Sequence, residues 1–391
     1  MKRILYVGYY DVKDNIDENR NYVMSATNKM SYICSALNRV GYQVEIISAS
    51  GTKNKQSYPG KCVPVTDNTQ LRLFPTMGTG CKLRRAVKHL TMQWHIFWYL
   101  FRNTRRNEPL LVYHSLGYVR MIRLLKKLKG FRLILEVEEI YADVTGDERA
   151  RKREMRLFKA ADAYLFPTEL LDEKLNAEDK PSVIIYGTYQ VEEDRKCSFE
   201  DPKLQGKIHC VYAGTFDPRK GGAQAAAAAA EHLPSNYHVH ILGFGSEEDK
   251  KSMQLQIEKV ASKGGATVTY DGLLSGEEYI RFIQSCQIGL STQMPDAEFN
   301  DTSFPSKVLS YLANGLHVVS VRIKALERSV ISDLLHYYDG NDPRAIAEAV
   351  KSVDMSQPYD SREKIHALDE KFCLEIKELL KQLGEKNKND R

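Results

Sequence analysis

The sequence predicts an α/β fold made of two doubly wound domains that face each other across a cleft. Short apolar strand segments alternate with amphipathic helical segments along most of the chain, and this alternation is typical of parallel sheets. The chain has 391 residues. That length is too great for one ordinary core and suits two domains of roughly 150–200 residues each. Both domains are therefore expected to be Rossmann-like.

The first domain is predicted over residues 1–190. Residues 2–8 and 42–48 are apolar strands, and the segment 24–40 between them has helical spacing. Such a strand–helix–strand unit of about 45 residues requires parallel strands. Residues 50–80 are polar and rich in Gly and Pro and are expected to be irregular. Further strands continue the alternation at 110–113, 133–137, 163–166 and 183–186.

The charged, aperiodic stretch 191–205 is predicted to be a linker, and residues 206–360 form the second domain. Residues 361–391 are predicted to be a C-terminal helix that packs back on the first domain. Strands are expected at 208–213, 238–242, 268–270, 288–291, 317–321 and 335–338. Helices are expected at 223–232, 247–262, 276–285, 305–314 and 342–352. Ligands of such folds bind at the carboxyl ends of the strands.

The composition is that of an ordinary globular protein, with 42% hydrophobic and 27% charged residues. No run approaches 18 apolar residues, and the opening MKRILYVGYY is typical of a first strand, not of a signal peptide. The seven cysteines are scattered without a CxxC pair. We therefore expect a cytoplasmic protein without a metal site or a cofactor.

The stretch 82–132 is strongly basic, with thirteen Lys and Arg and one acid, Glu108. Its segment 90–107 is rich in aromatic residues, and the segment 117–129 is basic and amphipathic. Aromatic and basic residues together suit an anionic membrane surface, so peripheral attachment to the inner face of the cell membrane is expected. Core aromatics and a solvated basic face are the alternative interpretation. No nucleic-acid-binding module is present.

Three turns follow predicted strands and contain glycine: GTFDPRKGG at 214–222, LGFGS at 242–246 and DGLL at 271–274. Glycine allows backbone to approach a ligand closely, and Lys220 adds a positive charge at a helix start, which suits a diphosphate. Plain turns with solvated basic residues are the alternative.

A further helix start is predicted at FPSK, residues 304–307. Pro305 suits the first helical position, Ser303 can cap the helix, and Lys307 lies in its first turn. The unpaired N–H groups of this turn and the helix dipole predict an anion site.

These segments resemble the retaining GT-B glycosyltransferases, and family four in particular (glycosyl transferases group 1). The resemblance lies in VYAGTFDPRKGG, HILGFGSEED, VTYDGLLSGEEY and FPSKVLSYLANGLHVVS of the second half, and in ALNRVGYQVEIIS and AADAYLFPTELL of the first. It implies a hexosyltransferase-type enzyme that binds a nucleotide-sugar donor mainly through its second domain. It also implies a glycan or lipid-linked acceptor and a role in cell-surface polysaccharide synthesis.

The resemblance carries donor-binding roles onto individual positions. Where the family has an Arg after the first glycine, this chain has Thr215, and Arg219 beside the matching Lys220 is the candidate substitute. The backbone near Gly272 and Leu273 is expected to lie against the base. The full donor set is Gly214, Thr215, Arg219, Lys220, Gly243, Gly245, Gly272, Leu273, Thr302, Ser303, Phe304, Pro305, Lys307 and Ser310.

Two family positions depart from the pattern. The family has Glu residues eight positions apart at this helix, of which the second binds the ribose hydroxyls, but Thr302 and Ser310 stand there. Ser310 can still form one hydrogen bond, and Glu298, Asn300 or Asp301 are candidates for the lost acceptor.

Catalytic candidates lie at strand ends of the first domain. The family often has a His at the position of Glu138, so Glu138 or its neighbour Glu139 is expected to position the acceptor, act as a base or stabilise positive charge. A helix-start acid pair is the alternative interpretation. His114 follows another strand and is the next candidate, although a structural role is the commoner one for a lone His.

No Asp-x-Asp motif occurs, so a metal-independent transferase is expected, with cations and a helix dipole stabilising the leaving diphosphate. Two alternatives stay open. One is a catalytically impaired nucleotide-sugar-binding or scaffold protein that lost the two Glu residues. The other is a different enzyme of this fold, such as a nucleotide-sugar epimerase.

Overall fold

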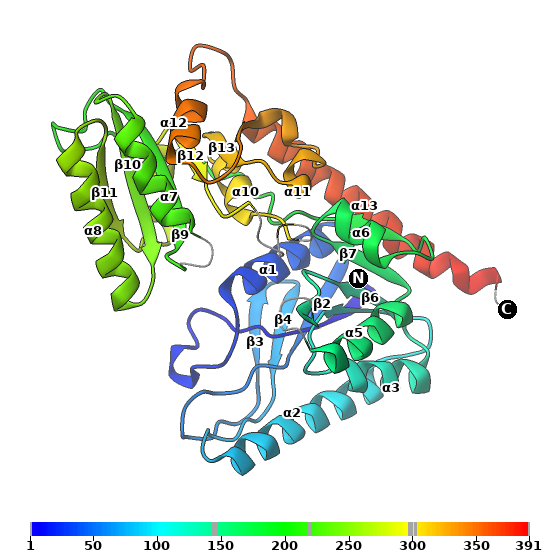
Figure 1. The fold of residues 1–391 in the computed structure, drawn as a ribbon. Coiled ribbons are helices and arrows are strands. Elements are labelled where there is room, and N and C mark those ends of the chain that lie inside the picture. Colours follow the sequence, from blue (N-terminus) through cyan, green and yellow to red (C-terminus); the bar gives the residue numbers. More distant parts are fainter. Residues whose placement is uncertain (1, 143–146, 218–220, 296–299, 301–302, 390–391) are drawn as a thin grey trace. The chain divides into compact units, whose positions relative to one another are not determined.

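The structure is a computed structural model that describes residues 2–142, 147–217, 221–295, 300 and 303–389 (Figure 1). It divides into two compact units. Unit 1 comprises Met1–Ile185 with Glu370–Arg391, and unit 2 comprises Tyr186–Asp369. Each unit is a mainly parallel sheet with helices packed on it, which confirms the predicted α/β fold with two Rossmann-like domains.

In the described residues, unit 1 has an eight-stranded sheet in the order β3-β4-β2-β1-β5-β6-β7-β8. Only the edge strand β3 is antiparallel to its neighbour. The strands are β1 Lys2–Gly8, β2 Tyr42–Ser48, β3 Lys61–Thr66, β4 Thr69–Leu73, β5 Pro109–Tyr113, β6 Arg132–Glu136, β7 Ala163–Phe166 and β8 Ser182–Ile184.

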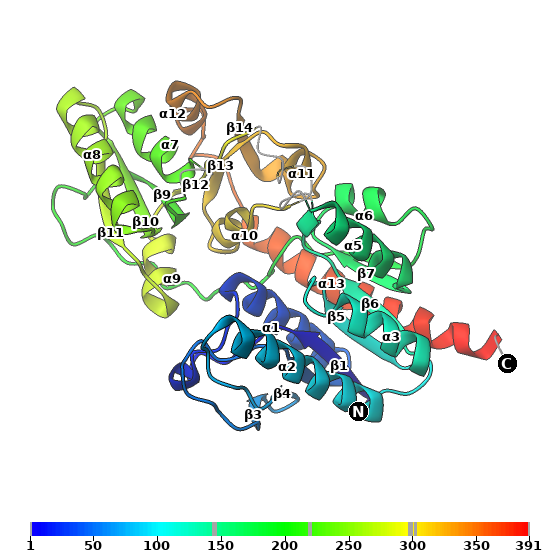
Figure 2. The same cartoon turned by 60° about the horizontal axis from the view of Figure 1, so that its bottom comes forward.

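The helices of unit 1 are α1 Met24–Arg39, α2 Lys82–Asn103, α3 Val119–Lys129, α5 Glu148–Ala160, α6 Glu169–Leu175 and the later part of α13 Ser361–Asn389. Leu5 and Val7 of β1 and Leu133 and Leu135 of β6 share one core with the buried faces of α2, α3 and α5. Because side chains alternate along a strand, the intervening residues face the other side of the sheet. The helices α2 and α3 contact each other in the layer that covers this core (Figure 2).

The segment predicted to be irregular, 50–80, contains the hairpin of β3 and β4, so that prediction was wrong. Thr69, Leu71 and Leu73 are buried while the residues between them are not, which is the period of a half-buried strand. β4 also pairs with β2 in parallel. The residues of β3 are largely exposed, so the sequence showed no buried face from which this edge strand could be predicted.

In the described residues, unit 2 has a six-stranded parallel sheet in the order β11-β10-β9-β12-β13-β14. The strands are β9 Ile208–Thr215, β10 Tyr237–Phe244, β11 Thr267–Gly272, β12 Ile288–Ser291, β13 His317–Val321 and β14 Leu335–Tyr338. The helices are α7 Gly222–Ala229, α8 Glu247–Lys263, α9 Gly276–Gln284, α10 Ser306–Ala313, α11 Lys324–Glu327, α12 Pro343–Lys351 and the start of α13. α8 begins at a capping box formed by Ser246 and Asp249.

The segment 191–205, predicted as a linker, has no regular structure but is held on unit 2. Gln284 of α9 accepts a hydrogen bond from the Arg195 N–H at 2.5 Å and donates one to the Glu193 carbonyl at 2.8 Å. Farther along, the residues of α13 from Glu370 onward belong to unit 1, where Phe372 stacks on Tyr32 of α1 at 5.6 Å between ring centroids.

Three buried histidines lie side by side on the first two strands of unit 2. His209 Nδ1 is 3.0 Å from His240 Nε2, and His238 contacts the hydroxyls of Thr267 and Thr269. Burial, followed by the charge of His240, lowers the pKa of His238 to about 3 and that of His209 to about 4. His209 and His238 are therefore neutral in the folded state at neutral pH.

We predict that this cluster makes unit 2 acid-sensitive. As pH falls below about 6.5, these histidines bind protons in the unfolded chain, but in the folded cluster they stay unprotonated until about pH 4. In that window each such histidine lowers the unfolding free energy by ~1.4 kcal/mol per pH unit. The melting temperature should fall from pH 7 to pH 5. His238→Gln should flatten this dependence, and the matched change His366→Gln at an exposed site should not. Equal pH slopes in the two variants would refute the assignment.

Candidate functional site

The order of strands places a switch point beside β9, the first strand of unit 2. From β9 the chain adds β10 and β11 on one side, and then β12, β13 and β14 on the other. The helices that follow β9 and β12 therefore leave the sheet in opposite directions, which opens a crevice at the carboxyl ends of these two strands. Gly214 and Thr215 end β9 there, and Ser291 ends β12.

Lys307 crosses over the backbone at the end of β9. A Cβ at Gly214 would lie 2.5 Å from Cε and 3.0 Å from Nζ of Lys307, so a larger residue there would displace the end of this side chain. The Lys307 ammonium lies 4.9 Å from the ring centroid of Tyr212. The structure thus brings together Gly214 and Lys307, two residues that the sequence predicted for the donor site.

Two further glycines bring backbone against the same strand end. Gly243 has φ +140°, and a Cβ there would lie 1.7 Å from the Gly214 carbonyl oxygen. A Cβ at Gly245 would lie 2.9 Å from the Cβ of Phe216. Gly243 and Gly245 thus allow the strand ends and the following turn to pack closely, and their predicted approach to a ligand stays a prediction.

The helix α10 begins one residue later than predicted. Pro305 is the N-cap, not the first helical residue, and no side chain caps the helix. The Val308 N–H still bonds the Pro305 carbonyl at 3.1 Å. Phe304 stacks on Tyr186 with 4.6 Å between the ring centroids.

Two tyrosines hold α10 in place, Tyr311 on the sheet and Tyr279 on α9, and sequence reasoning missed both. The buried Tyr311 hydroxyl accepts a hydrogen bond from the Ala213 N–H at 2.8 Å. A Cβ at Gly289 would lie 2.4 Å from the Tyr311 ring. The Tyr279 hydroxyl lies 3.3 Å from Ser310 Oγ, so the one hydrogen bond expected of Ser310 is made within the protein. For Tyr311, its place directly after the predicted binding residue Ser310 was the available signal.

The remaining donor positions are spread along the same edge or lie outside the described residues. Gly272 ends β11 with φ +86°, and the Leu273 side chain after it is exposed. Asn300 donates to the carbonyls of Met294 and Pro295, both at 2.8 Å, so its amide nitrogen is already bonded to backbone nearby in the sequence. The candidates outside the described residues are Arg219, Lys220, Glu298, Asp301 and Thr302.

In unit 1, Lys29 and Glu138 form an ion pair at the end of β6. Lys29 Nζ lies 2.6 Å from Glu138 Oε1 and also donates to the Ile185 carbonyl at 2.9 Å. The Lys29 side chain is buried, whereas that of Glu138 is 27% exposed. Glu138 is thus a carboxylate that is held in place by a cation and reaches the surface.

A second carboxyl group, Glu136, lies on the same side of the strand and was not singled out from the sequence. It is fully buried and accepts a hydrogen bond from the Tyr6 hydroxyl. Burial, and then the charge of Glu138, raises the pKa of Glu136 to about 8. Glu136 is therefore largely protonated at neutral pH, next to the carboxyl of Glu138 that pairs with Lys29. The spacing of two in Glu136-Val137-Glu138 was the signal for this pair.

His114 is placed inside the core of unit 1. Its ring is 1% exposed, and Nε2 lies 3.2 Å from Oε1 of Glu154 on α5. Glu154 also accepts the N–H groups of Tyr141 and Ala142 at 2.9 and 3.1 Å. Burial lowers the pKa of His114 to about 3. The ring packs against Phe158 of α5 with 4.8 Å between the ring centroids and is closed off from solvent. Glu139 next to the Lys29–Glu138 pair is partly buried.

Among the residues that the structure describes, no group of three His, Cys, Asp or Glu side chains could hold a metal ion. In the same part of the chain, every helix is too short or too polar to cross a bilayer.

No known family profile and no curated protein sequence matches the chain, but solved structures match it. The α,α-trehalose-6-phosphate synthase of Burkholderia multivorans superposes with a TM-score of 0.65 at 10% identity, over 100% of this chain and 99% of that chain. The E. coli enzyme bound to UDP-2-fluoro glucose gives 0.60 at 13% identity, over 100% and 98%. The Burkholderia xenovorans enzyme in complex with glucose-6-phosphate gives 0.59 at 10% identity, over 100% and 100%.

The likeness extends over both units, and the strand order of unit 2 is that of a nucleotide-binding sheet. Membership of family four stays a prediction. The chain has a GT-B fold of two Rossmann-like units, as these solved structures do.

Proposed function

We propose that this protein is a retaining, metal-independent glycosyltransferase that moves a sugar from a nucleotide-sugar donor to a glycan or lipid-linked acceptor. The observation that carries the proposal is the strand end at Gly214, where glycine backbone and the Lys307 ammonium meet at the switch point of unit 2. A structurally similar protein, at 13% identity, binds UDP-2-fluoro glucose, which supports a donor of this chemistry.

In this proposal unit 2 binds the donor. The diphosphate contacts Lys307 and the N-terminus of α10, whose dipole favours negative charge. Arg219 and Lys220, which follow β9 in the sequence, add positive charge. The base lies along Gly272 and Leu273. Stabilising the leaving diphosphate with fixed cations and N–H groups is the electrostatic part of the reaction.

Unit 1 then binds the acceptor, and Glu138 is our candidate catalytic group. A retaining transfer builds positive charge on the sugar, and a fixed carboxylate stabilises it or orients the acceptor hydroxyl. The ion pair with Lys29 holds Glu138 in place. Glu139 stays a second candidate for the same role.

The acceptor and the setting are further parts of the proposal. The basic stretch 82–132 supports a cytoplasmic enzyme attached to the inner face of the cell membrane, acting in cell-surface polysaccharide synthesis. A sugar phosphate is the second candidate acceptor. A hollow of about 150 Å³ at the ends of β1 and β2 is lined by Asn21, Lys53, Lys88 and His89, and a solved structure of this fold holds glucose-6-phosphate.

The competing proposal is a catalytically impaired binding or scaffold protein. It is favoured by one observation, the replacement of both family carboxylates by Thr302 and Ser310, the latter already bonded to Tyr279. It predicts donor binding without turnover.

The function is tested with a thermal-shift panel of nucleoside diphosphates and nucleotide sugars in excess EDTA, followed by a turnover assay for released nucleoside diphosphate. A ligand at one hundred times its Kd adds ~2.7 kcal/mol of unfolding free energy, so the correct nucleotide should raise Tm clearly. Binding without turnover in any acceptor mixture would favour the scaffold. Turnover that requires magnesium or manganese would contradict the metal-independent class. If no nucleotide or nucleotide sugar binds, the proposal is refuted.

Lys307→Ala should weaken binding of the nucleoside diphosphate by ~1–3 kcal/mol, because it removes a charged hydrogen-bond donor from the phosphates. Gly214→Ala should act in the same direction, since its Cβ displaces Lys307. Titration calorimetry measures both. The matched control is Lys251→Ala on the exposed side of α8, which should bind like the parent. If all three variants bind with the same affinity as the parent, the diphosphate binds elsewhere on the protein.

Glu138→Gln should lower turnover by at least ~10²-fold and leave donor affinity almost unchanged, because the carboxylate acts on the reaction and not on the donor. Glu139→Gln, made in parallel, tests the second candidate. A melting curve checks that Lys29, left without its partner, does not unfold unit 1. Near-normal turnover in both variants would assign the pair a structural role.

A further inference from the structure

The outward face of α2 is apolar over three turns. Leu83, Val87, Leu90 and Trp94 follow one another at intervals of four, three and four residues, which places them on one side of the helix. Leu83, Leu90 and Trp94 are 60–74% exposed. The opposite side of α2, with Met92, Ile96 and Leu100, is buried in the core of unit 1. We call the four exposed residues the α2 stripe. Exposed apolar surface of this extent marks an interaction site.

A groove of about 660 Å³ runs beside the stripe, between α2 and α3. Leu90, Trp94 and Phe97 line it from α2, and Val119 and Leu124 line it from α3. Gln93 donates a hydrogen bond to the Gly117 carbonyl and so ties the two sides together. On α3, Leu124 and the next exposed leucine, Leu128, extend the apolar surface by one turn. The volume and the largely apolar lining of the α2–α3 groove suit a hydrocarbon chain.

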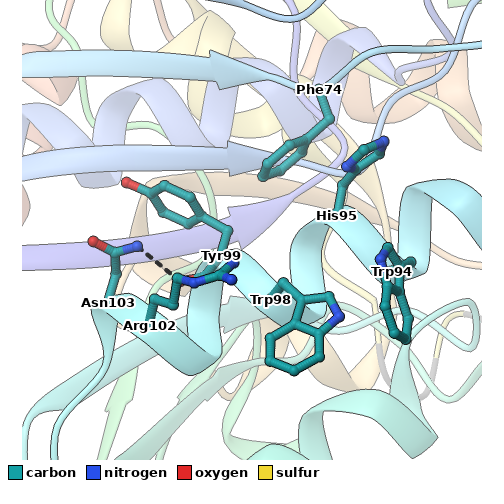
Figure 3. A pocket seen from close by; sticks show the side chains of 7 residues that line it. All are labelled: Phe74, Trp94, His95, Trp98, Tyr99, Arg102 and Asn103. Carbon is teal, nitrogen blue, oxygen red and sulfur yellow. Dashed lines mark hydrogen bonds between the residues drawn. The ribbon is translucent and has the colours of Figure 1, made fainter.

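On the other flank of α2, Trp94 also borders an aromatic hollow of about 430 Å³ (Figure 3). The Trp94 and Trp98 rings meet edge to face at 5.3 Å between centroids, and the Arg102 guanidinium lies 5.2 Å from the Trp98 ring. Trp94 is therefore a ridge between two hollows. Tryptophan combined with arginine is typical of side chains at the boundary between water and lipid.

The polar residues around this face carry one sign of charge. α2 and α3 contain no Asp or Glu. Their cations are Lys82, Arg84, Arg85, Lys88, Arg102, Arg120, Arg123, Lys126, Lys127 and Lys129. Lys126 pairs with Asp162 of unit 1, but Arg84, Arg85 and Arg120 are exposed. An apolar stripe bordered by cations matches acyl chains bordered by anionic headgroups, with ~1 kcal/mol per basic residue near such a surface.

We propose that α2 lies in the plane of an anionic bilayer, with the α2 stripe among the acyl chains and one lipid chain in the α2–α3 groove. The length and polarity of α2 fit a helix that lies in the interface and does not cross it. This inference deepens the membrane attachment in the proposed function and rests on that function for its purpose, because a lipid-linked acceptor is presented at the same surface.

The chain provides its own probe, since Trp94 and Trp98 are its two tryptophans and both lie on α2. The full-length protein is mixed with vesicles of phosphatidylcholine, with or without phosphatidylglycerol, whose chains carry bromine. With anionic vesicles at low salt, tryptophan emission should shift to the blue and be quenched by the brominated chains. Vesicles of phosphatidylcholine alone should cause little change, and high salt should weaken the effect.

Leu83→Ser combined with Leu90→Ser should lower partitioning to the anionic vesicles by about tenfold or more, because two exposed leucines no longer enter the acyl region. The matched control combines Leu255→Ser on α8 with Leu374→Ser on α13, which are equally exposed leucines outside the stripe. The control should bind like the parent.

Three results would overturn the proposal. They are no quenching by anionic vesicles, vesicle binding without quenching of the tryptophans, and a dimer in light scattering that the Leu83 and Leu90 changes dissociate. Nucleoside-diphosphate binding is measured on the same samples. If the donor binds but lipid does not quench, this inference and the proposed membrane attachment fail, and the proposed transferase stands. If lipid quenches but no nucleotide binds, only the proposed transferase fails.

Discussion

The close backbone approach at Gly214 is the constraint on which the candidate donor site depends. In the parallel register, Gly243 of β10 lies opposite Gly214 of β9, and a Cβ on Gly243 would overlap the Gly214 carbonyl. From the other side, Lys307 occupies the space that a Cβ on Gly214 would need. Tyr311 holds the helix that carries Lys307 through its bond to Ala213. Strand register, glycine and helix position thus fix one cation at one strand end.

Unit 1 has a different constraint. It places the ammonium group of Lys29 close to the carboxyl groups of Glu136 and Glu138 at buried and partly buried positions. An isolated buried charge would be costly, so Lys29 is paired with Glu138. A second ionised carboxyl beside that pair would be repelled, and Glu136 therefore keeps its proton and takes a hydrogen bond from Tyr6. The result is a single fixed negative charge, partly open to solvent, at the carboxyl end of β6.

Local patterns were sufficient for most of the fold but not for the contacts of the site. The apolar runs of β1, β2 and β9 and the glycines after β9 and β10 identify strands and turns directly. The β3–β4 hairpin was missed because its exposed edge residues obscured the alternation of Leu71 and Leu73. The partners Lys29 and Glu138 are 109 positions apart. Their meeting follows from the strand order, which no local pattern contains. The burial of His114 against Glu154 has the same origin.

The sheet of unit 1 keeps its two proposed roles apart. Alternation along each strand sends Leu5, Val7 and Leu135 toward α2, α3 and α5, and sends Tyr6 and Glu136 to the side of α1 and Lys29. The lipid-facing stripe is therefore on the outer surface of helices that cover one face, and the carboxylate pair lies on the opposite face. A change on the exposed side of α2 leaves the sheet between them intact. Membrane attachment and reaction chemistry can accordingly vary independently in this unit, because a packed β-sheet separates the residues responsible for each.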